Sequence, residues 1–401
     1  MGPGRPGYNV QMPSSLEHDR RRKRLQEMLS ARGLEGALLL EGVDVYYFAA
    51  TRQSGALFVP ASGDPVLLVR RSVERACAES AIADVRPFPS SRELGTFLPF
   101  RGRLGTTFDA VPAGTLEWWR SRLPLTELVD VSGPLREQRS VKSPAELAAL
   151  RSGGLLLAKV LAEVPAMLRE GLRELDLSVE IESRLRRAGN LGSPRLRGFN
   201  AEMFMGLALS GDSAAVPGFF DGPVIGRGLH PSYPQGASER RIGRDEPILL
   251  DFTFVHDGYV ADMTRMAVIG ALKQDLARAF EVALAIQDEV ARSLCPGVTG
   301  EELWERALSL SEKAGLGEQF MGPPGEQARF VGHGVGLELD ELPVLAPRQS
   351  GPLLPGQVVA VEPKFVFPDR GAVGIENTWL VGEGGGEKLT GGLGDGILRA
   401  R

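Results

Sequence analysis

The chain has 401 residues, enough for two domains of ordinary size, each with its own hydrophobic core. Apolar residues make up 43% and charged residues 24%, which is the balance of a folded globular protein. The net charge of −5 provides no positive field for phosphate backbones or anionic lipid. A disulfide-stapled mini-protein is therefore excluded, and we expect neither nucleic acid nor a membrane as a partner.

The cysteines and the N-terminal segment bear on the redox environment and on targeting. Cys77 and Cys295 lie far apart and outside any CxxC pairing, so we predict no disulfide framework and no thiolate zinc site, and expect both to be core residues. Residues 1–15 are rich in glycine and proline and lack the apolar segment of a secretory signal. We expect them to be a flexible N-terminus of a cytoplasmic protein.

Residues 16–138 show a mixed pattern. Helical spacing over 22–32 is followed by short apolar runs at 36–40 and 65–69. This alternation predicts an α/β domain with a sheet.

A second unit is predicted from residue 139 onward, to 401. Ser143 is a candidate N-cap, Pro144 takes the first helical position, and Glu146 completes a capping box. The predicted helices cover 143–167, 176–188, 274–294 and 300–314. The predicted strands cover 203–209, 247–255, 358–366 and 373–381. The unit is therefore predicted to be α+β.

Two aspartates lie on either side of a predicted hairpin turn at Asp257-Gly258, which suits a tight loop because glycine accepts a positive φ. With a two-residue loop, Asp262 lies opposite either Thr253 or Asp251, and both registers place the two aspartates on one face.

A buried carboxylate needs a cation or several hydrogen-bond donors. The alternative to a cation is that backbone amides and Arg265 hold Asp251. The hairpin by itself does not separate these alternatives.

Three more polar residues interrupt apolar segments. Glu362 follows a run of valines and precedes Pro363, Glu376 follows Gly-Ile, and His333 lies in a glycine-rich loop. A lone histidine in such a loop is more often structural than catalytic.

Together the two aspartates, two glutamates and one histidine form an oxygen-rich set that suits one or two divalent ions. Two such ions would activate a water and polarise a carbonyl, which is the chemistry of hydrolysis. The sequence contains no HExxH, GxSxG or Walker A motif.

In order and spacing these residues resemble the metallopeptidase family that includes methionine aminopeptidase, Xaa-Pro aminopeptidase and prolidase. The segment 139–150 resembles the entry to that catalytic domain, and residues 44–47 resemble part of a creatinase-type domain. The resemblance implies a pita-bread catalytic domain over 139–401, preceded by an α/β creatinase-type domain over 16–138. Methionine aminopeptidases usually lack the latter, which favours the proline-peptidase branch.

The resemblance also implies roles. Asp251 would hold one ion, Asp262 and Glu376 would bridge two, and His333 and Glu362 would complete the second ion's ligands. Glu362 would also shuttle a proton to the leaving nitrogen. The implied cofactor is two divalent ions, drawn from Mn, Co, Zn or Fe.

The substrate side resembles the family less closely. His230 is the candidate for an upstream substrate-binding and catalytic histidine, the alternative being a turn histidine. Asp340 stands where the family commonly has a second active-site histidine, so stabilisation from that side would differ, unless Asp340 is only a loop acid. Arg348 is a candidate for binding a substrate carboxylate, or an exposed loop residue. Gly374 and Asn377 replace an arginine and an aspartate, which implies a missing support for the last glutamate.

The resemblance implies metal-dependent hydrolysis of Xaa-Pro bonds, in a dipeptide or at a peptide N-terminus, by a homodimer acting on a peptide substrate. Two alternatives stay open. One is a non-peptidase enzyme on the same fold, either a creatinase-like hydrolase or a metal-dependent lyase. The other is a catalytically silent peptide-binding protein.

Overall fold

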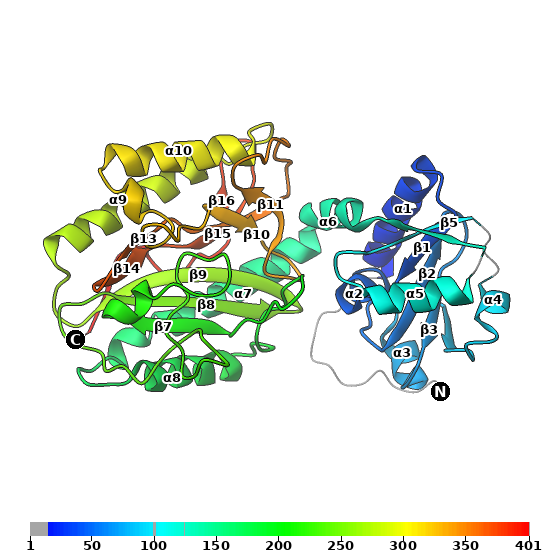
Figure 1. The fold of residues 1–401 in the computed structure, drawn as a ribbon, viewed down its shortest axis with the longest axis horizontal. Coiled ribbons are helices and arrows are strands. Elements are labelled where there is room, and N and C mark those ends of the chain that lie inside the picture. Colours follow the sequence, from blue (N-terminus) through cyan, green and yellow to red (C-terminus); the bar gives the residue numbers. More distant parts are fainter. Residues whose placement is uncertain (1–14, 99–101, 124, 401) are drawn as a thin grey trace. The chain divides into compact units, whose positions relative to one another are not determined.

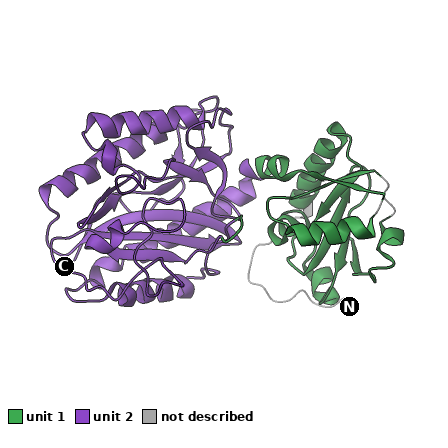
Figure 2. Ribbon diagram, viewed as in Figure 1, with its two compact units in different colours: residues 1–138, 197–200 green, residues 139–196, 201–401 purple. Residues whose placement is uncertain are grey.

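A computed structural model describes residues 15–98, 102–123 and 125–400 (Figure 1). The chain divides into two compact units: the first runs to Gln138 and includes 197–200, and the second contains the remainder (Figure 2). Residues 1–14 of the predicted flexible N-terminus lie outside the described residues, and Ser15 begins a helix. The assignment of 16–138 and 139–401 as functional domains stays a prediction.

The first unit is built on one six-stranded sheet in the order β4-β3-β2-β1-β5-β6. Its strands are β1 (Gly36–Leu39), β2 (Gly55–Pro60), β3 (Val66–Val69), β4 (Asp84–Pro87), β5 (Arg103–Thr106) and β6 (Glu127–Asp130). Its helices are α1 (Ser15–Ala31), α2 (Gly42–Ala49), α3 (Val73–Glu79), α4 (Leu94–Phe97), α5 (Ala113–Arg122) and α6 (Ser132–Ser140), which runs into the second unit. Parallel pairs join β1 to β5 and β5 to β6, whereas β1, β2 and β3 pair antiparallel. The predicted apolar runs are β1 and β3.

The second unit places strands between two pairs of helices, with α7 and α8 on one side and α9 and α10 on the other (Figure 1). The helices are α7 (Pro144–Leu161), α8 (Glu174–Arg187), α9 (Gln274–Arg292) and α10 (Gly300–Lys313), with short 3₁₀ turns η1 (Val164–Ala166), η2 (Gly211–Ala215) and η3 (Gly317–Gln319). One sheet has the order β17-β9-β8-β7 and another β11-β10-β12-β15-β16, and β13 pairs with β14. The strands are β7 (Gly206–Ser210), β8 (Ile248–His256), β9 (Tyr259–Val268), β10 (Gly332–Gly334), β11 (Glu341–Leu345), β12 (Val358–Val361), β13 (Lys364–Phe367), β14 (Gly371–Gly374), β15 (Asn377–Leu380), β16 (Glu387–Lys388) and β17 (Leu398–Arg399).

Helix α7 begins as its sequence predicts. The Ser143 side chain accepts a hydrogen bond from the Glu146 amide, and the Glu146 carboxylate accepts one from the Ser143 amide. The helix ends at Leu161, earlier than the predicted 167. Pro165 explains the difference, because its ring cannot donate to the carbonyl of residue 161 and clashes with it.

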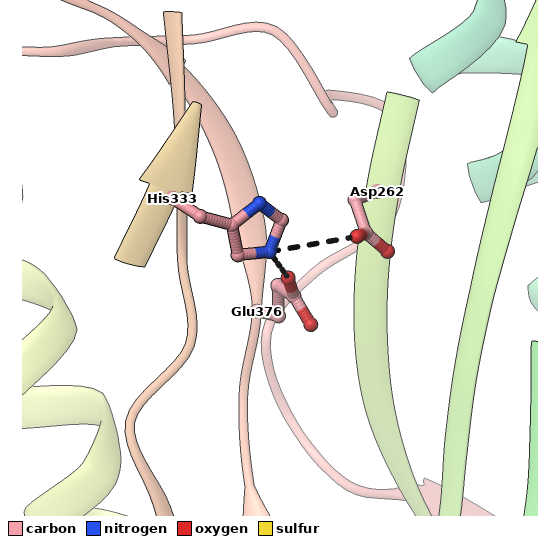
Figure 3. A group of neighbouring side chains, drawn as sticks. All are labelled: Asp262, His333 and Glu376. Carbon is pink, nitrogen blue, oxygen red and sulfur yellow. Dashed lines mark ion pairs between the residues drawn. The ribbon is translucent and has the colours of Figure 1, made fainter. Parts of the chain in front are cut away.

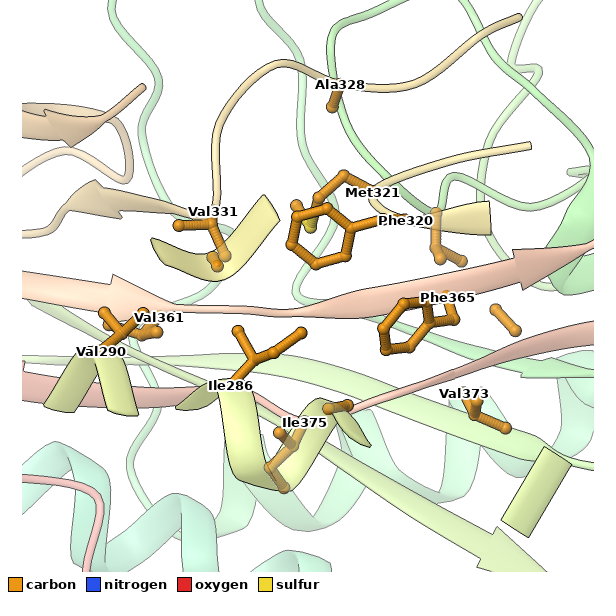
Figure 4. Close-up of a cluster of buried hydrophobic side chains, with 14 of the residues drawn as sticks. Ile286, Val290, Phe320, Met321, Ala328, Val331, Val361, Phe365, Val373 and Ile375 are labelled. Atoms are coloured by element: carbon orange, nitrogen blue, oxygen red, sulfur yellow. The ribbon is translucent and has the colours of Figure 1, made fainter. Parts of the chain in front are cut away.

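Apolar side chains from α9 pack against the strands next to Glu362 and Glu376, two of the predicted ligands (Figure 4). Ile286 and Val290 of α9 are fully buried against this cluster. Val361 and Ile375, which directly precede Glu362 and Glu376, belong to the same cluster. The packing therefore fixes the backbone on which both glutamates are carried.

Two other predictions have clear outcomes. Cys77 is exposed and Cys295 half-buried, so the prediction that both are core residues was wrong. Within the described part of the chain, no helix is both long enough and apolar enough to cross a membrane.

Candidate metal centre

The β8–β9 hairpin brings the two aspartates together. Asp257 and Gly258 both have positive φ, at 50° and 90°, so they form the two-residue turn that the sequence predicts. In the resulting register Asp262 pairs with Thr253, and Asp251 pairs with Thr264. Both aspartates consequently lie on one face of the sheet.

Each predicted glutamate lies where a strand breaks. The predicted strand 358–366 is interrupted at Glu362-Pro363 into β12 and β13, and 373–381 is interrupted at Glu376 between β14 and β15. Pro363 cannot donate a ladder hydrogen bond, which favours the first break. Because β12 and β15 pair in one sheet while β13 and β14 pair in another, both glutamates lie at the passage between the two.

His333 lies on the short strand β10 and points toward the acids (Figure 3). Its Nδ1 lies 3.2 Å from the Leu339 carbonyl oxygen, a bond that places the hydrogen on Nδ1 and leaves Nε2 as the free ligand atom. Nε2 lies 3.4 Å from Glu362 Oε1, 3.8 Å from Glu376 Oε1 and 4.0 Å from Asp262 Oδ2.

The loop that carries Leu339 is fixed by buried charges. Arg139 donates at 2.6 Å to both Glu338 and Glu341, and Lys142 donates at 2.8 Å to Glu341. Burial alone would raise the pKa of Glu341, but the positive charges of Arg139 and Lys142 lower it to about 2. The segment predicted to enter the catalytic domain therefore holds the loop behind His333.

Two buried oxygens in this centre have no hydrogen-bond partner among the described residues: Asp262 Oδ1 and Glu376 Oε1. One ligand atom each from Asp262, His333 and Glu376 can be chosen so that all lie within 4.8 Å of one another. Buried polar atoms are normally satisfied, so these orphaned oxygens indicate an absent partner. Two carboxylates and an imidazole fit a divalent ion.

The charge balance of the centre supports this interpretation. Burial, followed by the negative charges of Glu376 and Asp251, raises the pKa of Asp262 well above its ordinary value. Burial likewise raises the pKa of Glu376, even though Lys364 and His333 act against the rise. Burial opposes protonation of His333, but the carboxylates of Asp340, Glu362 and Glu376 raise its pKa. The centre thus has an excess of negative charge that a cation would relieve.

The sequence interpretation missed Lys364. Its Nζ donates to Asp251 Oδ2 at 2.8 Å, to Glu362 Oε2 at 2.7 Å and to Glu376 Oε2 at 3.1 Å. Burial disfavours its charge, but these three carboxylates outweigh that cost and raise the pKa of Lys364 well above its ordinary value. The available signal was a lysine two residues after Glu362 in an otherwise apolar segment.

The support predicted to be missing around Glu376 is present in another form. Asn377 Oδ1 accepts from Arg265 Nη2 at 2.9 Å, and Asn377 Nδ2 donates to Asp395 at 3.1 Å. Arg265 also donates to the Glu376 carbonyl and pairs with Asp395 at 3.1 Å. Arg265 therefore supports the backbone of Glu376, and Asp251 is held by Lys364.

The remaining predicted site residues are exposed, unlike the predicted ligands. Asp340 is 60% exposed in its side chain and lies 3.5 Å from His333 Nδ1, on the side away from the other acids. His230 is exposed and its ring bonds Ser232 of its own turn, and Arg348 is exposed, with its backbone amide donating to Glu301. The structure thus brings together the five predicted ligands, with Asp340 beside His333, whereas His230 and Arg348 are exposed and bonded locally, and their functional roles stay predictions.

Comparison with known proteins agrees with this geometry. Residues 148–383 match the model of metallopeptidase family M24, and residues 21–141 match the creatinase/prolidase N-terminal domain. The chain belongs to metallopeptidase family M24. Its predicted fold is confirmed: a creatinase-type N-terminal domain followed by a pita-bread catalytic domain, as in the prolidase and Xaa-Pro aminopeptidase branch of M24.

Similar M24 proteins extend over nearly the whole chain. The Xaa-Pro dipeptidase of Pyrococcus horikoshii is 24% identical over 370 residues, which cover 92% of this chain and 96% of the relative. The probable dipeptidase PepE of Mycobacterium tuberculosis is 27% identical over 369 residues, covering 88% and 89%.

Solved structures show the same fold. The prolidase from Pyrococcus horikoshii OT3 has a TM-score of 0.78 at 24% identity, covering 93% of this chain and 98% of its own. The X-Pro aminopeptidase from Thermotoga maritima has a TM-score of 0.79 at 22% identity, covering 94% and 99%.

Proposed function

We propose that this M24 protein hydrolyses Xaa-Pro peptide bonds in a metal-dependent reaction, releasing an N-terminal residue or splitting a dipeptide. The observation that carries the proposal is the buried group Asp262, His333 and Glu376, with two orphaned carboxylate oxygens. Relatives named as Xaa-Pro dipeptidases, at 24% identity, support the choice of bond.

The chain's own residues have distinct tasks in this proposal. A divalent ion held by Asp262, His333 and Glu376 would activate a water and polarise the scissile carbonyl. Glu362 Oε1 lies 3.4 Å from His333 Nε2, beside this group, and is the candidate to carry a proton to the leaving nitrogen. Glu362 Oε2 is held by Lys364, which fixes the orientation of that carboxylate.

The family resemblance supports further expectations about the setting. We propose manganese as the first ion to test, since oxygen-rich sites suit it. We also keep the predictions of a homodimer and of a cytoplasmic location. His230, Asp340 and Arg348 stay candidates for binding the peptide.

The test is a substrate panel on Mn²⁺-loaded protein. It compares Xaa-Pro dipeptides, longer Xaa-Pro peptides and matched Xaa-Ala peptides, with released amine as the measurement. Cleavage of dipeptides alone indicates a dipeptidase, and cleavage of the longer peptides indicates an aminopeptidase. Preference for the Xaa-Ala controls would contradict the proposal.

Two other functions are distinguished when metal binding and peptide binding are measured on the same samples. A metal-dependent lyase would bind metal but leave the whole panel uncleaved, and a creatinase-like hydrolase would leave the panel uncleaved without needing metal for its own reaction. A silent peptide-binding protein would bind Xaa-Pro peptides without releasing amine. Asp340, in place of an imidazole donor, is the feature that favours testing both.

A further inference from the structure

Lys364 lies inside the acidic centre. Its side chain is 2% exposed, and its Nζ contacts Asp251, Glu362 and Glu376 at 2.7–3.1 Å. A buried ammonium with three carboxylate partners is well compensated, because each N–H bond is charge-assisted. Lys364 is thus the cation for one side of the centre.

The neighbouring strand is shaped to admit this side chain. Lys364 pairs with Gly374 in the β13–β14 register. A Cβ at Gly374 would lie 2.5 Å from Lys364 Cγ, 2.8 Å from the Pro363 carbonyl oxygen and 2.9 Å from Lys364 Cα, so a side chain here would clash with both the lysine stem and the backbone beside it. Gly374 has no positive φ that would demand glycine, so the space explains it.

The two glutamates divide their oxygens between Lys364 and His333. Glu362 and Glu376 each give Oε2 to Lys364. Each turns Oε1 toward His333, at 3.4 Å and 3.8 Å. Oε1 of Glu376 is one of the orphaned buried oxygens, as is Oδ1 of Asp262. Of these two, Glu376 Oε1 lies on the histidine side, where Asp262 presents Oδ2 at 4.0 Å from Nε2, and the Asp251 side is occupied by Nζ of Lys364.

We propose that this centre binds one divalent ion, on Asp262, His333, Glu376 and Oε1 of Glu362, and that the Lys364 ammonium replaces a second ion. The inference rests on the proposed metal-dependent function and narrows it. A second ion on the Asp251 side would need oxygens of Asp251 and Glu376, which Nζ already contacts at 2.8 Å and 3.1 Å, so the ammonium lies where that ion would bind. The four carboxylates carry about four negative charges, of which one ion and one ammonium offset three.

The experiment measures how many ions bind, without any substrate. Chelated protein is loaded with Mn²⁺, excess ion is removed, and bound metal is counted by mass spectrometry and by titration calorimetry. We expect one ion per chain in the wild type and two in Lys364→Ala, which vacates the Asp251 side. Lys364→Met keeps the stem without the charge and should still bind only one. Lys313→Ala, at an exposed helical lysine, should match the wild type.

Electron paramagnetic resonance gives a second readout. A single Mn²⁺ gives an isolated six-line spectrum, whereas a neighbouring pair gives a coupled one. Two ions in the wild type, or one ion in both wild type and Lys364→Ala, would overturn the inference. If Lys364→Ala does not fold, the wild-type stoichiometry and spectrum still decide. Absence of any bound ion would refute the proposed metal-dependent function itself. One bound ion without cleavage of Xaa-Pro peptides would refute only the proposed substrate class.

Discussion

Nδ1 of His333 lies 3.2 Å from the carbonyl oxygen of Leu339 and 3.2 Å from that of Gly334, and these contacts turn Nε2 toward the buried acids. The orientation depends on a loop rather than on β10 alone. Glu338 and Glu341, on either side of Leu339 and Asp340, are tied to Arg139. A residue far away in the sequence therefore helps to hold the loop behind a candidate metal ligand.

Arg139→Met should weaken both the fold and the metal site. It removes the guanidinium from the buried carboxylates of Glu338 and Glu341, and breaking a buried ion pair costs about 3–5 kcal/mol. We expect a lower midpoint of urea unfolding and weaker Mn²⁺ binding, by about 10–100-fold, because the histidine loses its support.

Arg173→Met is the matched control. Arg173 pairs with Asp176 and Glu239 at the surface, where ion pairs contribute little. Its unfolding midpoint and its Mn²⁺ affinity should equal those of the wild type. Equal losses in the two variants would show that Arg139 has no specific role in positioning His333.

Asp262→Asn should abolish metal binding without harming the fold. Asp262 is buried against Glu376 and Asp251, and removing its charge relieves their repulsion. We expect the metal-free variant to melt at or above the wild-type temperature, while Mn²⁺ affinity and turnover are lost.

Asp257→Asn, in the turn of the same hairpin, is the control for the effect of an Asp-to-Asn change outside the metal centre. Asparagine tolerates the positive φ of that position, so stability and metal binding should both be retained. If Asp262→Asn kept full activity with no metal bound, the metal centre would not be the site of the reaction.

The first unit should lose stability in mild acid because of His18. This side chain is fully buried, with Nδ1 3.1 Å from the Tyr47 carbonyl oxygen. Burial, followed by the charges of Arg21 and Arg22, lowers its pKa from 6.5 to about 4.

The sign follows from proton linkage. Below pH 6.5 the unfolded chain binds a proton at His18 that the folded chain refuses until about pH 4, so stability falls with pH across that window. The loss amounts to about 3 kcal/mol. We expect the urea midpoint of the wild type to fall more steeply from pH 7 to pH 4 than that of His18→Gln. Parallel curves would contradict the assignment.

The core beneath the glutamates should be sensitive to truncation. Ile286 is fully buried in the cluster that contains Val361 and Ile375, and Ile286→Ala should cost about 2–5 kcal/mol. Leu155→Ala, on a helical position that is 54% exposed, should change stability by less than about 0.5 kcal/mol. Equal unfolding midpoints in urea would show that the cluster is not tightly packed.

The sequence predicts the part of the centre that local rules govern. The Asp257-Gly258 turn and the period of a strand suffice to place Asp251 and Asp262 on one face. They do not reveal the breaks at Glu362 and Glu376, because the apolar pattern runs through both and the strands change sheet only in the folded chain.

Long-range pairs also escape the sequence. The side chain of Lys364 packs directly against Gly374, and Arg139 donates to Glu338, which lies 199 residues further along the chain. A glycine or an arginine alone carries no sign of such a partner. Resemblance to the family implied the five ligands, yet it gave no indication of the lysine among them.

The central claim is tested most directly by reloading chelated protein with Mn²⁺ in steps, measuring bound metal and proline release from an Xaa-Pro dipeptide on the same samples. The account predicts no hydrolysis without metal and a rise in rate that levels off at one ion per chain. A plateau at two ions per chain would contradict only the proposal that Lys364 replaces the second ion. Full hydrolysis by metal-free protein would contradict the proposed metal dependence, and no hydrolysis of this dipeptide or of a longer Xaa-Pro peptide at any loading would contradict the proposed substrate.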